Sequence, residues 1–336
     1  MCFKKEGGAV VSTAPIKKNL LNIKRCKEMM QIERLSPDEY AKTYTPQHVF
    51  NSVDFTELNR DKAEDLHYLS VHDTKHRFGI ILGERNGMLR SPFSAPFGGF
   101  TTRGVQTLER MEEAVDLLLA YAAERSQQLA VTLQPLVYDE TQLSKWTSVL
   151  TRKMNVRCTD LNYHVDLQRI ANYEQIIDRS ARKNLHHAQN VPFNLIKLNS
   201  NDLEDVARAY EVIRRNREER GFPLRMTLEQ VWQTVSNVIR ADFFVLEHEG
   251  EDVAAAQVFH VAEGVAQVVY WGDIREYSAL RPMNFLTYSL FRHYYEAGLR
   301  TLDIGPSTED GIPNYGLCEF KENIGCSVTL KYSFTK

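Results

Sequence analysis

Hydrophobic and polar positions follow two different periods along this chain, and these periods predict strands and helices in a repeated order. Residues 77–100 read as a β-hairpin whose turn is Asn86-Gly87, a dipeptide strongly favoured in two-residue hairpin turns. Apolar residues then recur with helical spacing over 105–127. A strand over 129–135, a short helix over 140–154 and a strand over 158–167 complete this first unit.

The same order of elements returns in the second half of the chain. Residues 243–273 predict three antiparallel strands, with turns at Glu249-Gly250 and Glu263-Gly264. A duplicated order of this length indicates two related α/β domains. The other predicted elements are helices over 173–189, 202–219 and 227–240 between the units, and a helix over 282–298, a strand over 301–305, a helix over 315–325 and a strand over 328–334 that close the second one.

The repeated order predicts the mixed α/β class, with two tandem domains that each hold a twisted mixed sheet flanked by helices. We place the N-terminal domain at 30–168 and the C-terminal domain at 169–336. Residues 1–29 are basic and have little hydrophobic periodicity, so we expect a loosely ordered tail there. Met30 opens a cleaner pattern of apolar positions.

Composition narrows the function classes without naming one. The net charge of −3 gives no overall attraction to nucleic acid or to a membrane surface. No apolar run approaches the roughly 18 residues that a membrane span needs, and the five cysteines lack C-x-x-C spacing. His186 and His187 have no further clear ligand at metal spacing, so we expect no metal site. Together these features favour a cytoplasmic protein in a reducing compartment.

Short motifs in the second unit resemble a known superfamily. They are "SARKNLHHAQ" at 180–189, "VYWGD" at 269–273, "RPMNFL" at 281–286, "GLRTLDIG" at 298–305 and "LCEFKENIG" at 317–325. In this order they resemble the GNAT superfamily of N-acyltransferases. They are most similar to its two-domain Fem-type branch, whose known members attach amino acids to cell-wall precursors. "SPFSAPFGGF" at 91–100 resembles the proline- and glycine-rich loop of domain one in that branch.

The resemblance implies transfer of an acyl or aminoacyl group to an amine or sugar-amine acceptor bound between the domains. Acyl-CoA is one donor. However, the segment from Gly272 to Asn284 holds a single glycine where users of acyl-CoA usually carry two. Aminoacyl-tRNA is a second donor, which the net charge and the absence of a coiled-coil arm make less favoured. A non-catalytic binding module that kept the fold is the alternative. The sequence does not predict the oligomeric state.

The predicted donor site lies where the last strand of 243–273 meets the helix beginning near Pro282. Backbone N–H groups at a helix start, flanked by arginine side chains, suit a phosphate. The alternative is a solvated loop with two surface arginines. The residues assigned to this site are Tyr270, Trp271, Gly272, Arg275, Arg281, Met283 and Asn284.

The predicted catalytic residues are Asp303, Tyr315 and Lys321. Asp303 ends a strand at the edge where α/β sheets bind ligands, and its carboxylate could accept a proton or orient an amine. Lys321 occupies the place where many GNAT members carry a tyrosine and Fem-type members commonly carry a lysine. Its ammonium could stabilise an oxyanion or a phosphate. The alternatives are a structural carboxylate and an exposed helix lysine.

The predicted acceptor site combines the 91–100 loop with a basic helix. Proline fixes the backbone of that loop, and glycine lets the backbone approach a ligand closely. The alternative is a rigid loop that plugs the domain interface. Arg182 belongs to a positive stripe on the helix over 173–189, for which the alternative is a solvated face. The residues assigned to this site are Ser91, Phe93, Phe97, Gly98 and Arg182.

Overall fold

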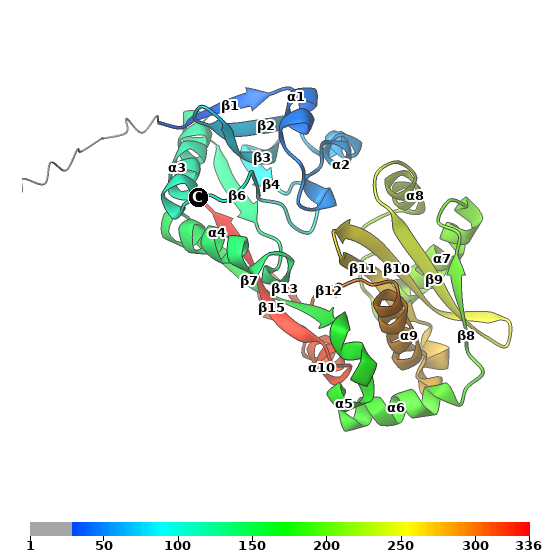
Figure 1. The fold of residues 1–336 in the computed structure, drawn as a ribbon. Coiled ribbons are helices and arrows are strands. Elements are labelled where there is room, and N and C mark those ends of the chain that lie inside the picture. The colour runs from blue at the N-terminus through cyan, green and yellow to red at the C-terminus, as the bar shows by residue number, and fades with distance from the viewer. Residues whose placement is uncertain (1–28, 126) are drawn as a thin grey trace, which may run out of the picture.

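The computed structural model describes residues 29–125 and 127–336, and Figure 1 shows the fold. The predicted tail over 1–29 therefore lies almost wholly outside the described residues. The first half of the chain contains β1 (Gln31–Leu35), α1 (Pro37–Thr43), α2 (Val53–Leu58), β2 (Asp65–His72), β3 (His76–Arg85), β4 (Met88–Ser91), β5 (Phe100–Thr102), α3 (Leu108–Glu124), β6 (Gln128–Thr132), α4 (Glu140–Lys153) and β7 (Asn155–Asp166).

The second half repeats this order after two short helices. It contains α5 (Tyr173–Ile176), α6 (Arg179–Gln189), β8 (Asn194–Leu198), α7 (Leu203–Arg220), α8 (Leu228–Asn237), β9 (Ala241–His248), β10 (Glu251–Ala262), β11 (Val265–Asp273), α9 (Pro282–Glu296), β12 (Thr301–Pro306), β13 (Thr308–Glu309), β14 (Ile312–Pro313), α10 (Tyr315–Asn323) and β15 (Ser327–Thr335). The predicted helices and strands of both units are confirmed, and so is the mixed α/β class. The single helix predicted over 173–189 is wrong, because Ile177 is extended and Asp178 caps a new helix, which separates α5 from α6.

Local chemistry explains where several elements begin and end. Asn86 and Gly87 both have positive φ, 52° and 70°, as a tight hairpin turn between β3 and β4 requires. The Asn314 side chain accepts a hydrogen bond from the backbone N–H of Leu317 and so caps α10, as predicted. Gly325 follows the helix with a φ of 86°, a backbone conformation that glycine adopts without strain.

The two halves share one sheet, and each contributes its last strand to the other. Among the described residues the strand order is β1-β2-β3-β4-β6-β15-β7-β12-β11-β10-β9-β8, with β5 beside β3. Thus β7, from the first half, pairs with β12, and β15, from the second half, pairs with β6. β7 and β15 also pair with each other in the centre. The boundary at 168/169 stays a prediction about the chain, while the sheet runs through both halves.

The cores follow this exchange of strands. Phe334 of β15 is buried in the core that α3 and α4 form with the first half of the sheet. Tyr163 and Val165 of β7 are buried beneath α9 in the second half. The C-terminus accordingly lies beside α3 and α4 in Figure 1. α7 and α8 cover the opposite face of β9, β10 and β11.

A cluster of aromatic side chains also joins the halves. Phe50, Phe55 and Phe97 of the first half pack in the same core as Val212 and Phe243 of the second. The rings of Phe50 and Phe97 meet edge to face, with their centroids 5.1 Å apart. The 91–100 loop is therefore part of the contact between the two halves.

Candidate active site

The paired strands β11 and β12 separate at one defined point. Their parallel pairing covers Val265↔Thr301 to Gln267↔Asp303 and then stops, although β11 continues to Asp273 and β12 to Pro306. Both strands have irregularities just beyond it. β11 has an extra residue between Val268 and Tyr270 against β10, and β12 has one between Asp303 and Gly305 against β7. Such a divergence at the carboxyl ends of parallel strands is where α/β sheets bind ligands.

Asp303 lies at this point and is completely buried. One carboxylate oxygen accepts hydrogen bonds from the Tyr138 hydroxyl and the Gln267 amide, both at 2.8 Å. The other accepts from the Asn162 amide at 2.7 Å and the Gly305 backbone N–H at 2.8 Å. Burial and the neighbouring carboxylate raise the pKa of Tyr138 well above its ordinary value, so its hydroxyl stays a donor. The four donors stabilise a carboxylate in the interior.

Lys321 of α10 contacts the same strand end. Its ammonium is buried and donates to the backbone carbonyls of Ile304, Gly305 and Pro306, at 3.0, 2.9 and 3.2 Å. Burial lowers the pKa of Lys321 to about 8, and the positive charge of Arg217 contributes in the same direction. The lysine is thus neither an exposed helix residue nor free, because all three of its donors are engaged.

Gly305 turns the chain between these two anchors. Its φ is 74°, and a Cβ added there would meet no atom within 4 Å. The backbone at the end of β12 therefore borders open space while Asp303 and Lys321 fix its conformation. The buried positive charge of Lys321 lies at this strand end, and a fixed positive charge suits stabilisation of a developing negative charge.

Arg217 of α7 is a further cation of this region that sequence reasoning missed. Its guanidinium lies over the ring of Tyr270 on β11, 5.3 Å from the centroid, and its Nε is buried without a hydrogen-bond partner. Burial lowers the pKa of Arg217. The one available signal was its position four residues after the buried Ile213, which turns it toward the sheet.

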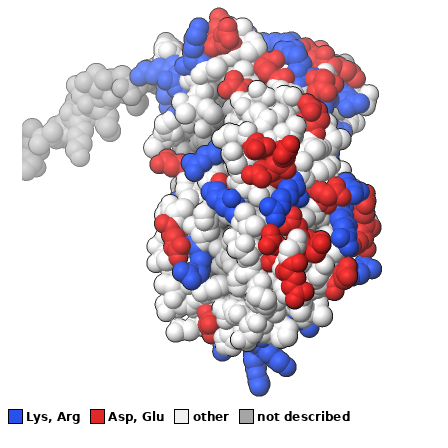
Figure 2. All heavy atoms as spheres, turned by 90° about the vertical axis from the view of Figure 1, so that its right-hand side faces the viewer, with Lys and Arg blue, Asp and Glu red and all other residues white. Residues whose placement is uncertain are grey.

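The other arginines of α7 are paired with carboxylates. Arg208 pairs with Asp252, Arg214 with Glu211 and Glu218, Arg215 with Glu219, and Arg220 with Asp273. Figure 2 shows the face on the side of α7 and α8, where Lys/Arg and Asp/Glu side chains are interspersed. Among the arginines of this helix, Arg217 alone has no carboxylate partner and is directed at β11.

The predicted donor residues Tyr270 and Trp271 lie on opposite sides of β11. Tyr270 lies beneath Arg217, whereas Trp271 contacts Phe320 of α10 with ring centroids 6.3 Å apart. Gly272 packs against α7, since a Cβ there would come within 2.3 Å of Asn216. This glycine therefore serves the close approach of helix and strand.

The remaining predicted donor residues surround the start of α9. Arg275 donates to the Glu219 backbone carbonyl at 2.7 Å and so fastens this loop to the end of α7. Arg281 is exposed and has a left-handed backbone, with φ 60°, immediately before Pro282. Met283 and Asn284 are half-buried in the first turn. Their role in binding a donor stays a prediction.

The predicted acceptor residues fall into two groups. Ser91 and Gly98 close the 91–100 loop, because the Ser91 hydroxyl accepts from the Gly99 N–H at 2.9 Å and Gly98 lies against it. Phe97 is buried in the aromatic cluster, 5.0 Å from the ring of Tyr138. Phe93 instead lines a cavity of about 380 Å³, whose other lining residues are Lys62, Gly83, Arg85, Asn86 and Arg90.

Among the described residues, neither Arg182 nor Tyr315 forms a hydrogen bond or an ion pair with Asp303 or Lys321. Arg182 is half-buried on α6, with its Nε buried and unpartnered and another nitrogen 3.5 Å from the Ile177 carbonyl. Tyr315 begins α10 and is 80% exposed, whereas Lys321 on the same helix is 2% exposed. Sequence reasoning also missed the Asp303 donors Tyr138, Asn162 and Gln267, which come from three separate elements.

Comparison with a family model identifies a matching segment that contains these residues. Residues 173–322 match the family model described as acetyltransferase (GNAT) domain. This segment is similar to GNAT acetyltransferase domains. No curated protein matches the chain at a significant level. The matched domain includes β11, β12, Asp303 and Lys321, together with Arg217.

Solved structures extend the similarity to both halves of the fold. FemX is similar over 91% of this chain and 96% of its own, with a TM-score of 0.65 and 11% identity. L-PGS from Bacillus licheniformis is similar over 90% and 92%, with a TM-score of 0.55 and 14% identity. A tandem GNAT protein from the clavulanic acid biosynthesis pathway is similar over 91% and 98%, with a TM-score of 0.52 and 13% identity. The tandem GNAT fold predicted from the sequence is therefore confirmed.

Two of the free cysteines lie in or beside α10, the helix that carries Lys321. Cys158, Cys318 and Cys326 are free thiols, of which Cys318 lies in α10 and Cys326 just after it. None of the helices in the described part of the chain is long and apolar enough to cross a membrane.

Proposed function

We propose that the protein transfers an acyl or aminoacyl group to an amine, at the point where β11 and β12 diverge. The observation that carries the proposal is the end of β12. There a buried carboxylate and a buried ammonium fix one short backbone segment beside open space. The similarity of residues 173–322 to GNAT acetyltransferase domains supports the proposal, because a fixed positive charge at this strand end would serve acyl transfer.

In this proposal a neutral amine attacks the carbonyl carbon of the donor, and the carbonyl oxygen acquires negative charge. The charges of Lys321 and Arg217 stabilise that oxyanion or an anionic group of the donor. Asp303 keeps the end of β12 in place through its hydrogen bond to the Gly305 N–H. The tetrahedral intermediate then expels the leaving group, and the proton released by the amine passes to solvent or to the leaving group. No covalent enzyme intermediate is required.

Acyl-CoA is the first donor to test, because the GNAT match covers the second half of the chain. Aminoacyl-tRNA is the second, because FemX and L-PGS have similar folds. The interspersed charges in Figure 2 offer no continuous basic track for RNA on that face. The acceptor is an amine or sugar amine. The cavity beside Phe93, with Lys62, Arg85 and Arg90, suits an acceptor that also carries negative charge.

A binding module without catalysis is the second candidate. It is favoured by two contacts in the predicted donor site, where Gly272 packs on Asn216 and Arg275 holds the end of α7. Both residues thus serve the fold at the place where a pyrophosphate would be expected.

The deciding experiment offers the purified protein acetyl-CoA or a charged tRNA pool, each with a panel of amines and amino sugars. Binding is followed by calorimetry, and products are identified by mass spectrometry. We expect turnover with one donor class and its loss in Lys321→Met. Donor binding without turnover across the panel would favour the binding module. An absence of binding to either donor class would contradict acyl transfer and favour a binding module that has lost the donor site.

A further inference from the structure

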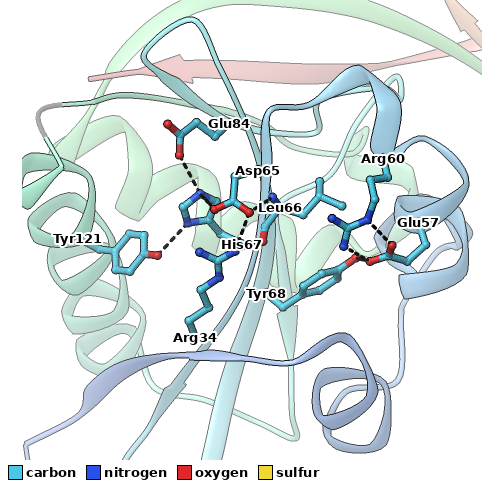
Figure 3. A network of polar contacts seen from close by, with 9 residues as sticks. All are labelled: Arg34, Glu57, Arg60, Asp65, Leu66, His67, Tyr68, Glu84 and Tyr121. Carbon is cyan, nitrogen blue, oxygen red and sulfur yellow. Dashed lines mark hydrogen bonds and ion pairs between the residues drawn. The ribbon is translucent and has the colours of Figure 1, made fainter.

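A separate cluster of ionisable side chains lies on β2 and β3 in the first half of the chain. Asp65 of β2 and Glu84 of β3 are directly opposite each other in the antiparallel register. His67 lies two residues after Asp65 and therefore on the same face of the sheet. Figure 3 shows the three side chains converging, with Tyr121 and Arg34 around them. Two carboxylates in directly opposed positions repel each other unless a cation lies between or beside them.

The three ligand atoms have the spacing of a metal site. His67 Nε2 lies 3.0 Å from a Glu84 carboxylate oxygen and 3.6 Å from Asp65 Oδ2. All three atoms lie within 4.8 Å of one another. An ion about 2.0–2.2 Å from each nitrogen and oxygen ligand places those ligands roughly 3–4 Å apart. The observed nitrogen–oxygen distances fall in that range without movement of the strands.

The three side chains of the cluster differ in their exposure to solvent. The His67 side chain is 2% exposed, whereas those of Asp65 and Glu84 are 44% and 24% exposed. The imidazole thus lies at the base, and the two carboxylates lie at the rim, where they meet solvent. An ion can enter from that side and keep water in its remaining coordination positions, as three-ligand sites do.

The surrounding groups orient the ligands in the way that metal sites require. The Tyr121 hydroxyl lies 2.8 Å from His67 Nδ1, so the second ring nitrogen is held and Nε2 is directed at the carboxylates. Asp65 Oδ1 accepts hydrogen bonds from the Arg34 guanidinium at 2.7 Å and from the Leu66 backbone N–H at 2.8 Å, so Oδ2 is left for an ion. Hydrogen-bonded ligands of this kind are a regular feature of protein metal sites.

The charge balance also favours a cation. Arg34 compensates one of the two carboxylates through its contact with Asp65. Among the described residues, Glu84 forms no ion pair with a lysine or an arginine, and its contact of this kind is with His67. The Glu84 carboxylate therefore faces the His67 ring nitrogen without a lysine or arginine to balance its charge, and a divalent cation between them would supply that balance.

We propose that Asp65, His67 and Glu84 bind a divalent transition-metal ion, with Zn²⁺ as the best match to one imidazole nitrogen and two carboxylate oxygens. Mg²⁺ and Ca²⁺ fit less well because they prefer oxygen ligands throughout. The ion fastens β2 to β3 and, through Arg34, to β1. This proposal differs from the expectation from the sequence that the protein holds no metal. The site shares no residue with the acyl-transfer site, so either proposal can fail without the other.

The test compares zinc binding to metal-free full-length protein and to three variants by calorimetry. Glu84→Gln and Asp65→Asn each remove one ligand charge with little change of shape. Glu174→Gln is the matched control, because Glu174 lies 3.0 Å from the Nε2 of His186 and these two residues do not belong to a cluster of three potential ligands among the described residues. We expect one Zn²⁺ per chain in wild type and in the control, and binding at least about tenfold weaker in both cluster variants.

Thermal unfolding provides the second readout. Zn²⁺ should raise the thermal midpoint of wild type and of Glu174→Gln, because an ion that binds only the folded chain stabilises it. It should leave the midpoints of the folded cluster variants nearly unchanged. Circular dichroism without metal shows which variants fold, and one folded cluster variant is enough. Wild type that binds no zinc, or cluster variants that bind it as tightly as wild type, would overturn the proposal.

Discussion

The two halves of the molecule place corresponding parallel strands side by side but continue them differently. In the first half, β4 and β6 pair from Met88↔Gln128 to Ser91↔Val131, and Gly98 then pairs with Leu133 beyond them. The 91–100 loop thus closes the gap between these strands. In the second half, β11 and β12 diverge after Gln267↔Asp303, with no such closure recorded for the described residues. Related orders of elements therefore yield a closed edge in one half and an open one in the other.

The side chains differ in the same sense. Val131 is the last β6 residue in its parallel pairing, where β12 has the buried Asp303. The helix that follows β6 buries Trp146 and Val149, whereas the helix that follows β12 buries Cys318 and Lys321. Apolar residues thus fill the first half where the second half has charged ones. In the proposed function, this difference assigns the chemistry to the second half and a supporting role to the first.

The largest expected effect comes from removing the charge that distinguishes α10. Lys321→Met keeps a side chain of similar length but removes the ammonium beside the end of β12. Turnover with the identified donor should fall roughly 10²-fold or more, because the fixed positive charge near the reacting centre and the anchor of the β12 end are both lost. Steady-state kinetics measure this, with the thermal midpoint recorded in parallel because three carbonyls lose their donor.

The matched control lies on the corresponding helix of the first half. Lys145 of α4 also donates to a backbone carbonyl, that of Gln106, at 3.4 Å. Lys145→Met should leave turnover unchanged. Equal losses in the two variants would mean that the comparison between the halves carries no information about catalysis.

Asp303→Asn should weaken the fold of the second half. An amide has one oxygen where the carboxylate has two, so the four donors around Asp303 no longer all find an acceptor. We expect the free energy of unfolding to fall by about 2 kcal/mol or more, as for hydrogen bonds to charged groups. Urea titration measures it. A stability equal to that of wild type would show that the charge of Asp303 is not needed to hold β12.

The pKa of Lys321 predicts a pH dependence. If the ammonium is the active form, turnover should fall as pH rises through about 8, the pKa that burial imposes on it. Lys321→Arg keeps a positive charge at these pH values, so any activity it retains should not show this decline. A pH–rate profile of kcat distinguishes the two. The same decline in both proteins would assign the titration to another group.

The effect of Lys321 on stability changes with pH in the opposite direction to its effect on turnover. Its pKa is about 8 in the folded chain and 10.5 ordinarily, so between these values the unfolded chain binds more protons. Stability therefore rises with pH across this window, and the cost of burying the charge is fully present below about pH 8. Lys321→Met should lack this rise when the two proteins are compared by urea titration.

Arg217→Met should have the smallest effect. It removes the unpaired guanidinium over Tyr270, so the affinity for an anionic donor should fall about tenfold and depend less on salt. Arg215→Met, two residues earlier, removes an exposed arginine paired with Glu219 and should change affinity little. Calorimetry at two salt concentrations measures both. Equal affinities in the two variants would remove Arg217 from the donor site.

The sequence predicted the elements well because their signals are local. The hairpin at Asn86-Gly87, the Asn314 cap and the helix that carries Lys321 each depend on a few adjacent residues. It did not predict which groups Lys321 contacts, since the carbonyls of 304–306 are aligned with the ammonium only after β12 and α10 pack. The partners of Asp303 come from residues 138, 162 and 267, which no periodicity connects.

The cluster of Asp65, His67 and Glu84 was missed for a related reason. Asp65 and His67 have the i, i+2 spacing of one strand face, but Glu84 joins them only through the register of β2 with β3. That register is set by the hairpin and the buried face, not by the charged residues themselves.

The exchange of β7 and β15 has a consequence for how the protein folds and fails. Neither half can complete its sheet from its own contiguous residues, because its terminal strand lies in the other half. β15 pairs with β6 across about 200 residues of chain, a high contact order that slows assembly. When one half unfolds, the other loses the strand that pairs with its edge. The unpaired edge that remains can then pair with another chain and promote aggregation. The two halves should therefore unfold as a single cooperative unit, although each resembles an independent domain.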